Sequence, residues 1–402
     1  MNKAIENIPN GYKKTEIGVI PVDWEVVKLV DICQPSPKRI NPITCQKNYK
    51  CIELEHLSQE TGRLLGYTFT ENIKSQKSLF YKNDVLFGKL RPYLKKFYFA
   101  KFDGVCTTEI WVLKSKKNLE NNWLYYLMQS NRIIEVANQS TGTKMPRAEW
   151  NVVGETPIPL PPLPEQKAIA TVLSDTDSLI QALEKNIAKK QLIKKGAMQE
   201  LLAPKEGWET KTLGEIAEYR RGSFPQPYGW SQWYDDNKGM PFVQVFDVDK
   251  NMKLKSTTKQ KISDLAKSKS VFVKQGSVVL TIQGSIGRIA VTQYDAYVDR
   301  TLLIFTKYTI PMNVILFSYL VQEKFRIEKE NAPGGIIKTI TKEALSKFII
   351  SFPKSIEDQT RIAQILSDMD AEIEVLEKRL AKYKQIKQGL MQVLLTGKIR
   401  LV

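Results

Sequence analysis

The stretch QKAIATVLSDTDSLIQALEKNIAKKQLIKKGAMQELL, from Gln166 to Leu202, returns as QTRIAQILSDMDAEIEVLEKRLAKYKQIKQGLMQVLL, from Gln359 to Leu395. Twenty of the 37 aligned positions are identical at a constant offset of 193 residues, where ordinary composition would give roughly two or three by chance. Each copy reads as a helix and follows a stretch of about one domain's length whose sequence differs between the halves. The chain is therefore a two-unit repeat, with a head and a helix in each unit.

Apolar residues in both copies recur in alternating steps of three and four, the spacing of a helix that packs along one seam against another helix. Lys387 interrupts the second seam, and Lys190 and Lys194 interrupt the first. The simplest partner for each helix is the other, although an ordinary helical hairpin has the same periodicity. The residues expected in this packing are Leu173, Ile180, Leu183, Ile187, Leu201, Leu366, Ile373, Leu376, Leu380, Leu390 and Leu394.

The heads share a plan despite their different sequences, since Trp24 opens the first and Trp208 the second. Short apolar runs at 84–87 and 110–113, and again at 277–280 and 302–305, read as buried strands. Residues 157–164, PIPLPPLP, are expected to form a stiff extended connector into the first helix. The expected fold class is α+β, with two globular heads separated by two long antiparallel helices of coiled-coil type in a pseudo-two-fold repeat.

The amino-acid composition limits the classes of function that the chain can have. Sixty Lys and Arg against 43 Asp and Glu leave a net charge of +17 in 402 residues, which favours a polyanionic partner. The longest apolar run, Val314 to Val321, is too short to cross a membrane, and Met1 to Lys14 has no apolar core of the kind a signal peptide needs. All four cysteines lie in the first head, which suits free thiols, so we expect a cytoplasmic protein without disulfides.

A catalytic site has little support in the sequence. The single histidine, His56, stands between Glu55 and Leu57 and reads as a strand or turn residue. Cys45, Cys51 and His56 match no recurrent zinc spacing. No two glycines are spaced two apart, so neither a Gly-x-Gly-x-x-Gly loop nor a related methyl-donor loop is present. We expect no catalytic residue, no metal site and no cofactor in this chain.

Nucleic-acid binding has better support, because basic residues occur with aromatic residues and turn formers in both heads. For any single residue the alternative is a solvated surface charge, and Lys250 to Lys274 reads as a solvated loop. Trp230, Trp233 and Tyr234 suit core packing and base contact equally. The candidate DNA-binding residues are Lys89, Arg91, Lys95, Lys96, Lys144 and Arg147 in the first head and Arg220, Arg221, Gln283, Arg288, Arg300 and Lys338 in the second.

Antiparallel helices with a head at each end would act as a ruler on DNA. A helix of 29 to 37 residues is about 45 to 55 Å long, which bounds the separation of the heads at roughly 13 to 16 base pairs. The second helix must also return to the neighbourhood of Tyr12 to Trp24, just as the first runs directly into Trp208. The C-terminal tail is therefore expected close to the start of the first head.

These features together resemble the specificity subunits of type I restriction-modification systems. The resemblance covers nearly the whole chain. It rests on LPPLPEQ at 160–166, the LSDxD openings and KxGxMQxLL endings of both helices, LLTGKIRL at 394–401, and YKKTEIGVIP at 12–21 with Trp24 after it. The second helix departs from the proline-rich opening, since KSIEDQ stands at 354–359.

The resemblance implies two target recognition domains, each of which reads one half of an asymmetric bipartite site in double-stranded DNA. It implies assembly with two methyltransferase subunits and with restriction subunits, and it places S-adenosylmethionine, ATP and Mg in those partners. The domains expected are a 1–20 arm, target recognition domains at 21–163 and 204–353, a spacer helix at 164–203, and a C-terminal helix with its tail at 354–402.

Two other functions compete at this point. A stand-alone, duplicated nucleic-acid-binding regulator would bind a specific site tightly without partners. An enzyme built around His56, Glu53 and Glu55 would lose its activity in a His56→Ala variant, whereas a specificity subunit would keep its DNA preference.

Overall fold

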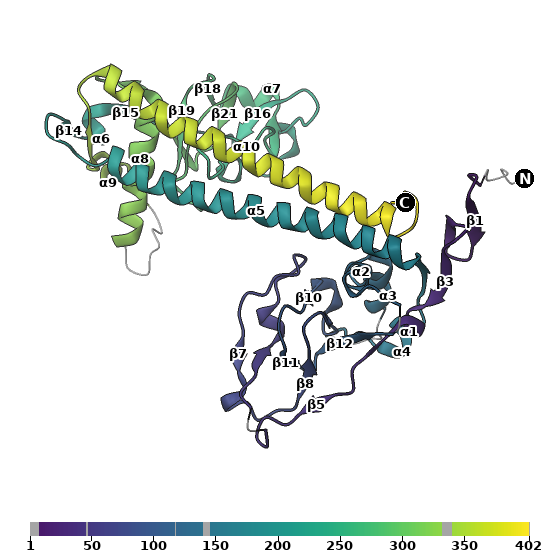
Figure 1. Ribbon diagram of the computed structural model, residues 1–402. Coiled ribbons are helices and arrows are strands. Elements are labelled where there is room, and N and C mark those ends of the chain that lie inside the picture. The colour runs from purple at the N-terminus through teal and green to yellow at the C-terminus, as the bar shows by residue number, and fades with distance from the viewer. Residues whose placement is uncertain (1–7, 46, 117, 140–144, 332–339, 402) are drawn as a thin grey trace, which may run out of the picture. The chain divides into compact units, whose positions relative to one another are not determined.

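The computed structural model describes residues 8–45, 47–116, 118–139, 145–331 and 340–401 (Figure 1). The chain divides into two compact units. Unit 1 comprises Met1–Glu184 and Lys378–Val402, and unit 2 comprises Lys185–Glu377. Head 1 is the part of unit 1 before residue 163, and head 2 is the part of unit 2 between residues 202 and 355.

Head 1 contains two main sheets. One has the order β10 (Phe97–Phe99), β9 (Val85–Gly88), β12 (Ile110–Ser115) and β4 (Cys33–Pro35), and all its pairings are antiparallel. The other has the order β5 (Arg39–Ile40), β8 (Lys77–Phe80), β11 (Gly104–Thr107), β6 (Lys50–Ile52) and β7 (Thr68–Phe69), with β11 and β6 parallel. A short ribbon of β1 (Tyr12–Thr15) and β2 (Gly18–Pro21) precedes them.

Head 2 repeats this topology except that its second sheet has four strands where head 1 has five. Its first sheet has the order β15 (Ala217–Arg221), β22 (Leu302–Tyr308), β19 (Val278–Thr281) and β20 (Ile289–Val291). Its second has the order β17 (Gln260–Ile262), β16 (Met240–Val243), β21 (Ala296–Val298) and β18 (Val271–Val273), and again one pair, β16 with β21, is parallel. The four apolar runs expected as strands form β9, β12, β19 and β22, so the shared plan of the heads is confirmed.

Helices pack on the sheets of both heads (Figure 1). Those of head 1 are α1 (Leu29–Ile32), α2 (Asn121–Leu127), α3 (Asn131–Ala137) and α4 (Trp150–Val153). Those of head 2 are α6 (Leu213–Ile216), α7 (Asp264–Lys267), α8 (Val314–Asn331) and α9 (Lys342–Ser346).

The extended segment expected at 157–164 is confirmed in part, but it pairs with another strand and does not stand alone as a connector. Residues Pro157–Leu160 form β13, which pairs with β3 (Glu25–Lys28), and the helix already begins at Leu163. A two-stranded ribbon consists of two edges, so prolines in it cost no hydrogen bond on the open side. Ile158 anchors the ribbon because its side chain is fully buried. In head 2 the equivalent ribbon pairs β14 (Glu209–Thr212) with β23 (Ile349–Phe352).

The two copies of the repeat form α5 (Leu163–Leu201) and α10 (Ile356–Leu394), each a continuous helix of 39 residues. Each helix runs through both units, since the division falls after Glu184 in α5 and before Lys378 in α10. In unit 2, Lys190 pairs with Glu372 and Lys194 pairs with Asp370. Residue numbers therefore rise along α5 as they fall along α10. The helix segments are therefore antiparallel within that unit.

Each copy opens on a buried glutamine that ties its helix to a head. Gln166 Oε1 accepts from the backbone N of Glu120, just before α2, at 2.9 Å. Gln359 Oε1 accepts from the backbone N of Asn313, just before α8, at 2.8 Å. Both glutamines are almost inaccessible to solvent, and a buried amide requires such partners. The helix and head of each unit are thus joined at equivalent points.

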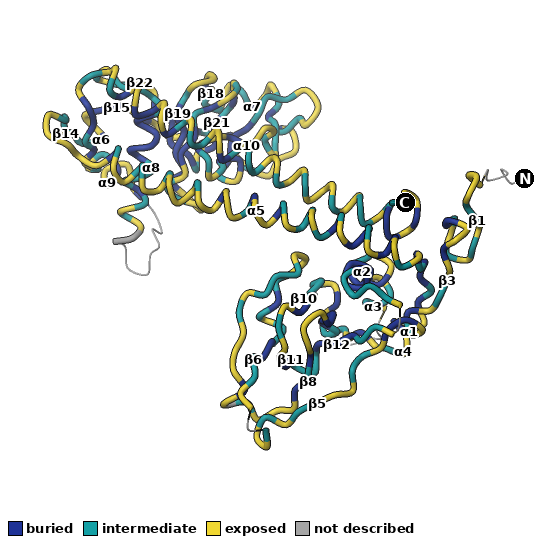
Figure 2. The backbone as a smooth tube through the Cα atoms, viewed as in Figure 1, coloured by how far each residue is buried: buried dark blue, intermediate teal, exposed yellow. Residues whose placement is uncertain are grey.

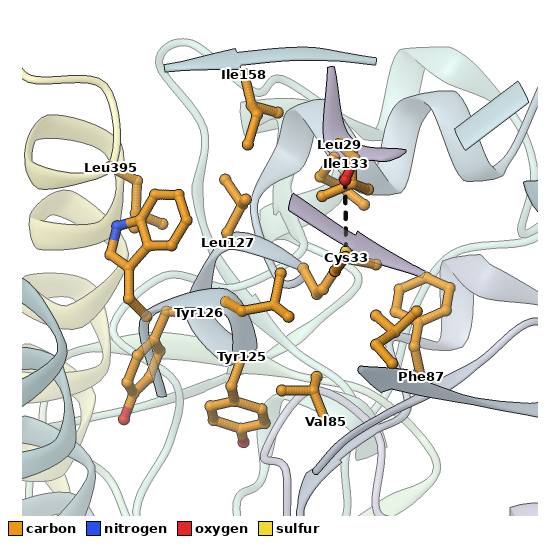
Figure 3. Close-up of a cluster of buried hydrophobic side chains, with 14 of the residues drawn as sticks. Leu29, Cys33, Val85, Phe87, Tyr125, Tyr126, Leu127, Ile133, Ile158 and Leu395 are labelled. Atoms are coloured by element: carbon orange, nitrogen blue, oxygen red, sulfur yellow. Dashed lines mark hydrogen bonds between the residues drawn. The ribbon is translucent and has the colours of Figure 1, made fainter. Parts of the chain in front are cut away.

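Each unit has its own core, to which the helices contribute (Figure 2). In unit 1, Leu173 and Leu394 pack with Trp24 and Trp123, and Figure 3 shows part of this cluster around Tyr126 and Leu395. In unit 2, Leu366 packs in the core that includes Phe317. Of the expected packing residues, Leu173, Ile180, Leu183, Ile187, Leu366, Ile373 and Leu394 are buried, and Leu201, Leu376, Leu380 and Leu390 are half-buried.

The C-terminal tail lies against the start of head 1, as expected. Arg400 Nη1 and Nη2 donate to the two carboxylate oxygens of Asp23 at 2.8 and 2.7 Å. Arg400 Nη2 also donates to Glu165 at 2.8 Å, and the Trp24 indole donates to the same oxygen at 2.8 Å. The Glu165 side chain is only 1% exposed, so this carboxylate depends on its partners.

All four cysteines are free thiols, three of them buried. Burial raises the pKa of Cys33 and of Cys51 to about 12, and it raises the pKa of Cys106 well above its usual value. Cys45 lies in a loop and is half-buried. Because the thiolate is the reactive form, the three buried thiols should react slowly, whereas Cys45 is the most accessible of the four.

Thiol labelling of the native chain should therefore modify Cys45 first. With an aromatic disulfide reagent at pH 8, we expect about one fast-reacting thiol per chain, and the remaining three only in guanidinium. The Cys45→Ser variant should lack the fast phase. Rapid modification of Cys33 or Cys51 in the native chain, located by mass spectrometry, would contradict the burial described above.

Within the part of the chain that the structure describes, none of the helices is long and apolar enough to cross a membrane.

Candidate nucleic-acid interface

Head 1 carries a basic loop between β9 and β10, at residues 89–96. Arg91 and Lys95 have left-handed backbone φ values of 52° and 49°, and they flank a short 3-10 helix, Pro92–Leu94. Tyr93 in that helix is 51% exposed, and Lys95 Nζ lies 3.9 Å from the carboxylate of Glu60. Such a backbone costs on the order of 1 kcal/mol per residue and persists only where surrounding contacts fix it.

Backbone hydrogen bonds hold this loop in place. Arg91 N donates to Pro146 O at 2.8 Å, and Lys89 N donates to Glu109 O at 2.9 Å. Leu90 also forms an isolated β-bridge with Arg147. The basic loop and the segment around Arg147 therefore form one surface of head 1.

The basic side chains of this surface differ in whether they already bind other groups of the protein. Lys96 Nζ donates to Leu54 O at 2.6 Å, and the Arg147 guanidinium holds Glu109 through two hydrogen bonds of 2.9 and 3.0 Å. Arg91 is exposed and Lys89 is half-buried. Arg91 is thus best placed to reach a phosphate or a base edge, whereas Arg147 also shapes the loop.

Head 2 carries the equivalent loop between β19 and β20, at 282–288. Gln283 and Arg288 are exposed there. Arg288 N donates to Thr281 Oγ1 at 2.9 Å, which closes the loop at its base. Gly287 has φ +83°, and a Cβ at this position would lie 2.7 Å from the ring of Phe325. A glycine is required here because a larger residue would meet both strain and a clash.

The two loops leave their sheets in the same way. Lys89 N donates to Glu109 O at 2.9 Å in head 1, and Ile282 N donates to Thr301 O at 3.0 Å in head 2. Residues 89 and 282 are 193 apart, the offset of the repeat. The equivalence extends beyond the similar sequences, so the two heads present corresponding loops.

Arg220, Arg221 and Arg300 are all exposed at one end of the first sheet of head 2. Arg221 ends β15, and Arg300 lies just before Leu302, where the neighbouring strand β22 begins. The Arg300 guanidinium stands 5.8 Å from the centre of the Tyr228 ring. The structure thus brings these three arginines to the base of the 282–288 loop.

Some candidates are separated from these surfaces or undescribed. Lys144 and Lys338 lie outside the described residues. Trp233 is buried, and its indole donates to Pro227 O at 3.1 Å, so it is a core residue. Trp230 stacks on it and is 53% exposed. The DNA contacts of all candidates remain predictions.

The interpretation of Lys250 to Lys274 as a solvated loop is wrong. The stretch contains β17, α7 and β18. Ile262 and Ala266 are fully buried within it. Its apolar residues form short groups at Ile262, Leu265–Ala266 and Val271–Val273, but the lysines between them dominate the composition.

His56 has a local structural role. Its Nδ1 accepts from the backbone N of Glu53 at 3.0 Å, and its side chain is 14% exposed. Across the described ranges, His, Cys, Asp and Glu side chains do not gather into a group of three that could hold a metal ion.

A half-buried polar triad, which sequence patterns did not predict, joins each head to the helices. In unit 1 the Tyr126 hydroxyl donates to Asp177 Oδ2 at 2.9 Å, and Lys387 Nζ lies 2.7 Å from the same side chain. Tyr126 belongs to α2, Asp177 to α5 and Lys387 to α10. Burial, and next the nearby carboxylate, raise the pKa of Tyr126, so its hydroxyl stays protonated.

Unit 2 holds the same triad with the helices exchanged. The Tyr319 hydroxyl of α8 donates to Asp370 Oδ2 of α10 at 2.6 Å, and Lys194 of α5 forms an ion pair with Asp370. Each residue is 193 positions from its counterpart in unit 1. The lysines also stand over the tyrosine rings, 5.5 Å away in unit 1 and 5.3 Å in unit 2. Lys387 and Lys194, two of the three lysines that interrupt the apolar seams, are therefore members of the triads, whereas Lys190 pairs with Glu372.

A second polar contact lies one heptad further along each helix. In unit 1, Glu184 forms ion pairs with Arg63 of head 1 and with Lys384 of α10, the latter at 2.8 Å. In unit 2, Glu377 lies 3.9 Å from Lys250 of head 2 and accepts from Gln191 Nε2 of α5 at 3.5 Å. Residues 184 and 377 are again related by 193.

The model of the type I restriction modification DNA specificity domain matches residues 21–194 and 205–385, one copy on each half of the repeat. The chain belongs to this family. The reading as a stand-alone duplicated regulator is not supported, and the two matched copies coincide with the two head-and-helix units of the repeat.

Relatives of full length support the assignment. The chain is 27% identical to a Methanocaldococcus jannaschii protein named as the specificity subunit of the type I restriction enzyme MjaX, over 97% of this chain and 96% of the relative. It is 24% identical to the MjaVIII specificity subunit of the same organism, over 95% and 94%.

Two solved structures share the fold. A chain from a study of complex assembly and conformational transition of the type I restriction-modification system aligns with a TM-score of 0.59 at 20% identity, over 94% of this chain and 99% of that one. The S subunit from M. genitalium aligns with a TM-score of 0.59 at 15% identity, over 92% and 96%.

Proposed function

We propose that each head of this specificity subunit reads one half of an asymmetric bipartite site in double-stranded DNA. The observation that carries the proposal is the equivalence of the loops at 89–96 and 282–288, which differ in sequence but leave corresponding sheets through corresponding hydrogen bonds. Loops that are held in the same way but carry different side chains are suited to recognise two different DNA sequences.

The helices α5 and α10 set the unread spacer between the half-sites. They run antiparallel along their whole length and separate the two target recognition domains. A helix of 39 residues is about 58 Å long, which limits the spacer to about 17 base pairs. The support for this geometry is the presence of antiparallel segments of the same two helices in both units.

The chain works as the non-catalytic, DNA-reading part of a cytoplasmic complex. Two methyltransferase subunits bind to the two repeat units, and restriction subunits join them. S-adenosylmethionine, ATP and Mg bind to those partners. The two-fold repeat supports a pair of identical partners, since equivalent surfaces recur 193 residues apart.

The test is co-expression with the neighbouring methyltransferase gene, followed by single-molecule sequencing of host DNA for methyladenine. A bipartite motif with a fixed spacer that disappears when this chain is omitted is the expected result. An intact complex with active methyltransferase that leaves no such motif, or a motif that persists without the chain, would contradict the proposal.

Removal of one exposed basic side chain should affect one half-site only. In the Arg91→Ala variant we expect recognition of one half-site to weaken by roughly tenfold or more, and in Arg288→Ala that of the other, because a base contact by arginine is worth about 1–3 kcal/mol. The measurement is methylation of oligonucleotides in which each half-site is varied separately. Lys274→Ala, at an exposed turn, is the control. Equal effects of Arg91→Ala on both halves would contradict the two-reader arrangement.

A further inference from the structure

The polar triads occupy positions where apolar residues would pack the helices. Lys387 and Lys194 lie in the helix seam, and their side chains are only 13% and 17% exposed. Their partners Asp177 and Asp370 are 20% and 24% exposed. Buried ion pairs contribute little net stability compared with apolar side chains of the same volume, whereas a buried polar group can specify the register of packed helices.

Each triad connects three separate elements at one point. In unit 1 these are α2, α5 and α10, and in unit 2 they are α8, α10 and α5. The carboxylate can satisfy both its partners only in one alignment of the two helices and one position of the head. A slide of one helix by a single turn, about 5.4 Å, would break both contacts.

The second contact fixes the angle of each head. Asp177 and Glu184 are seven residues apart on α5, as Asp370 and Glu377 are on α10, so each pair spans about 10 Å on one helix face. The head residues at these second contacts, Arg63 and Lys250, lie in hairpins closed by equivalent bridges, Leu57 with Leu64 and Val248 with Leu254. Two points of attachment determine both the position and the direction of a head on its helix.

We propose that the triads Tyr126–Asp177–Lys387 and Tyr319–Asp370–Lys194 are positioning residues that set the spacer length between the two half-sites. The proposal rests on the proposed function, since a spacer has meaning only for a bipartite site. Both tyrosines are almost inaccessible to solvent, so in this arrangement neither is available to contact a base. They act through the alignment of head and helices, so that each head meets DNA at a fixed distance from the other.

The experiment uses the full complex of this chain with methyltransferase subunits. Tyr126→Phe and Tyr319→Phe remove one hydroxyl from each triad and keep the ring. Methylation rates are measured on DNA duplexes with the native spacer and with spacers one base pair longer and shorter. The control is Tyr125→Phe, which removes a buried hydroxyl from the same helix α2 and leaves the Asp177 triad intact.

We expect both triad variants to lose discrimination between spacers by about tenfold, the factor that corresponds to the loss of a hydrogen bond to a charged group. The half-site sequences should stay unchanged, and Tyr125→Phe should keep the native spacer preference. If a tyrosine variant fails to assemble, Lys387→Gln and Lys194→Gln test the same contacts from the other helix and should give the same result.

If the assembled triad variants discriminate between spacers as the wild type does, the positioning role is overturned. The proposed function stands in that case as long as the wild-type complex methylates a bipartite motif. Altered half-site sequences with an unchanged spacer would overturn it as well, because the tyrosines would then act in base recognition. A wild-type complex that methylates no bipartite motif would overturn both proposals.

Discussion

Leu173→Ala and Leu366→Ala should each destabilise one unit by about 3 kcal/mol, since truncation of a fully buried leucine costs 2–5 kcal/mol. Both side chains are completely inaccessible, Leu173 in the core of unit 1 and Leu366 in that of unit 2. The two residues occupy the same place in the repeat, so the substitutions are chemically matched. For a unit of this size, such a loss lowers the unfolding temperature by roughly 6 to 12 °C.

Hydrogen-exchange mass spectrometry locates the effect. Leu173→Ala should accelerate exchange of the amides of β9 and β12, whereas Leu366→Ala should act on β19 and β22. Leu192→Ala is the control, because Leu192 is 70% exposed on α5 and should change little. Faster exchange in both heads from either substitution would mean that the chain has one cooperative core and not two.

Arg400→Met should destabilise unit 1 by about 2–3 kcal/mol, the value of hydrogen bonds to a charged group with little access to water. Arg400 is the shared partner of Asp23 and Glu165, and its loss leaves the inaccessible Glu165 carboxylate with Trp24 and the backbone N of Leu401. The measurement is urea denaturation followed by tryptophan fluorescence, to which the buried Trp24 contributes.

Lys398→Met serves as the matched control, since Lys398 is exposed on the same tail two residues earlier. Glu165→Gln combined with Arg400→Met should recover part of the loss, because it removes the uncompensated charge. Equal stabilities of Arg400→Met and Lys398→Met would show that the tail contributes nothing to unit 1.

The helices were the most predictable part of the fold. The repeat copies begin three residues after the observed helix starts at Leu163 and Ile356, and their three-and-four spacing of apolar residues is specific to helices. The strands β9 and β19 were also predictable as short apolar runs. The ribbon at Pro157–Leu160 was not, since its partner β3 lies about 130 residues away and proline-rich sequence favours an isolated extended segment.

The triads could not be predicted from the sequence for a related reason. Tyr126, Asp177 and Lys387 are far apart in the chain, and Lys387 alone reads only as an interruption of the seam. A signal was nevertheless present, because all three recur at the offset of 193, and Tyr126 and Tyr319 recur where the surrounding sequences differ. Polar residues repeated at matching seam positions indicate a shared contact. The DNA-reading residues carry no such signal, since different target sequences require different side chains.

The division of the chain has a consequence for its synthesis. Unit 2 is one continuous segment, Lys185–Glu377, whereas unit 1 needs residues from both ends of the chain. The core of unit 1 includes Leu394 and Leu395, which the ribosome adds only after the whole of unit 2. Domains usually fold in the order of their synthesis. Here head 1 cannot complete its core until unit 2 has been synthesised, and part of that core stays exposed until then. A nascent chain arrested before Leu394 is therefore the form most in need of a chaperone.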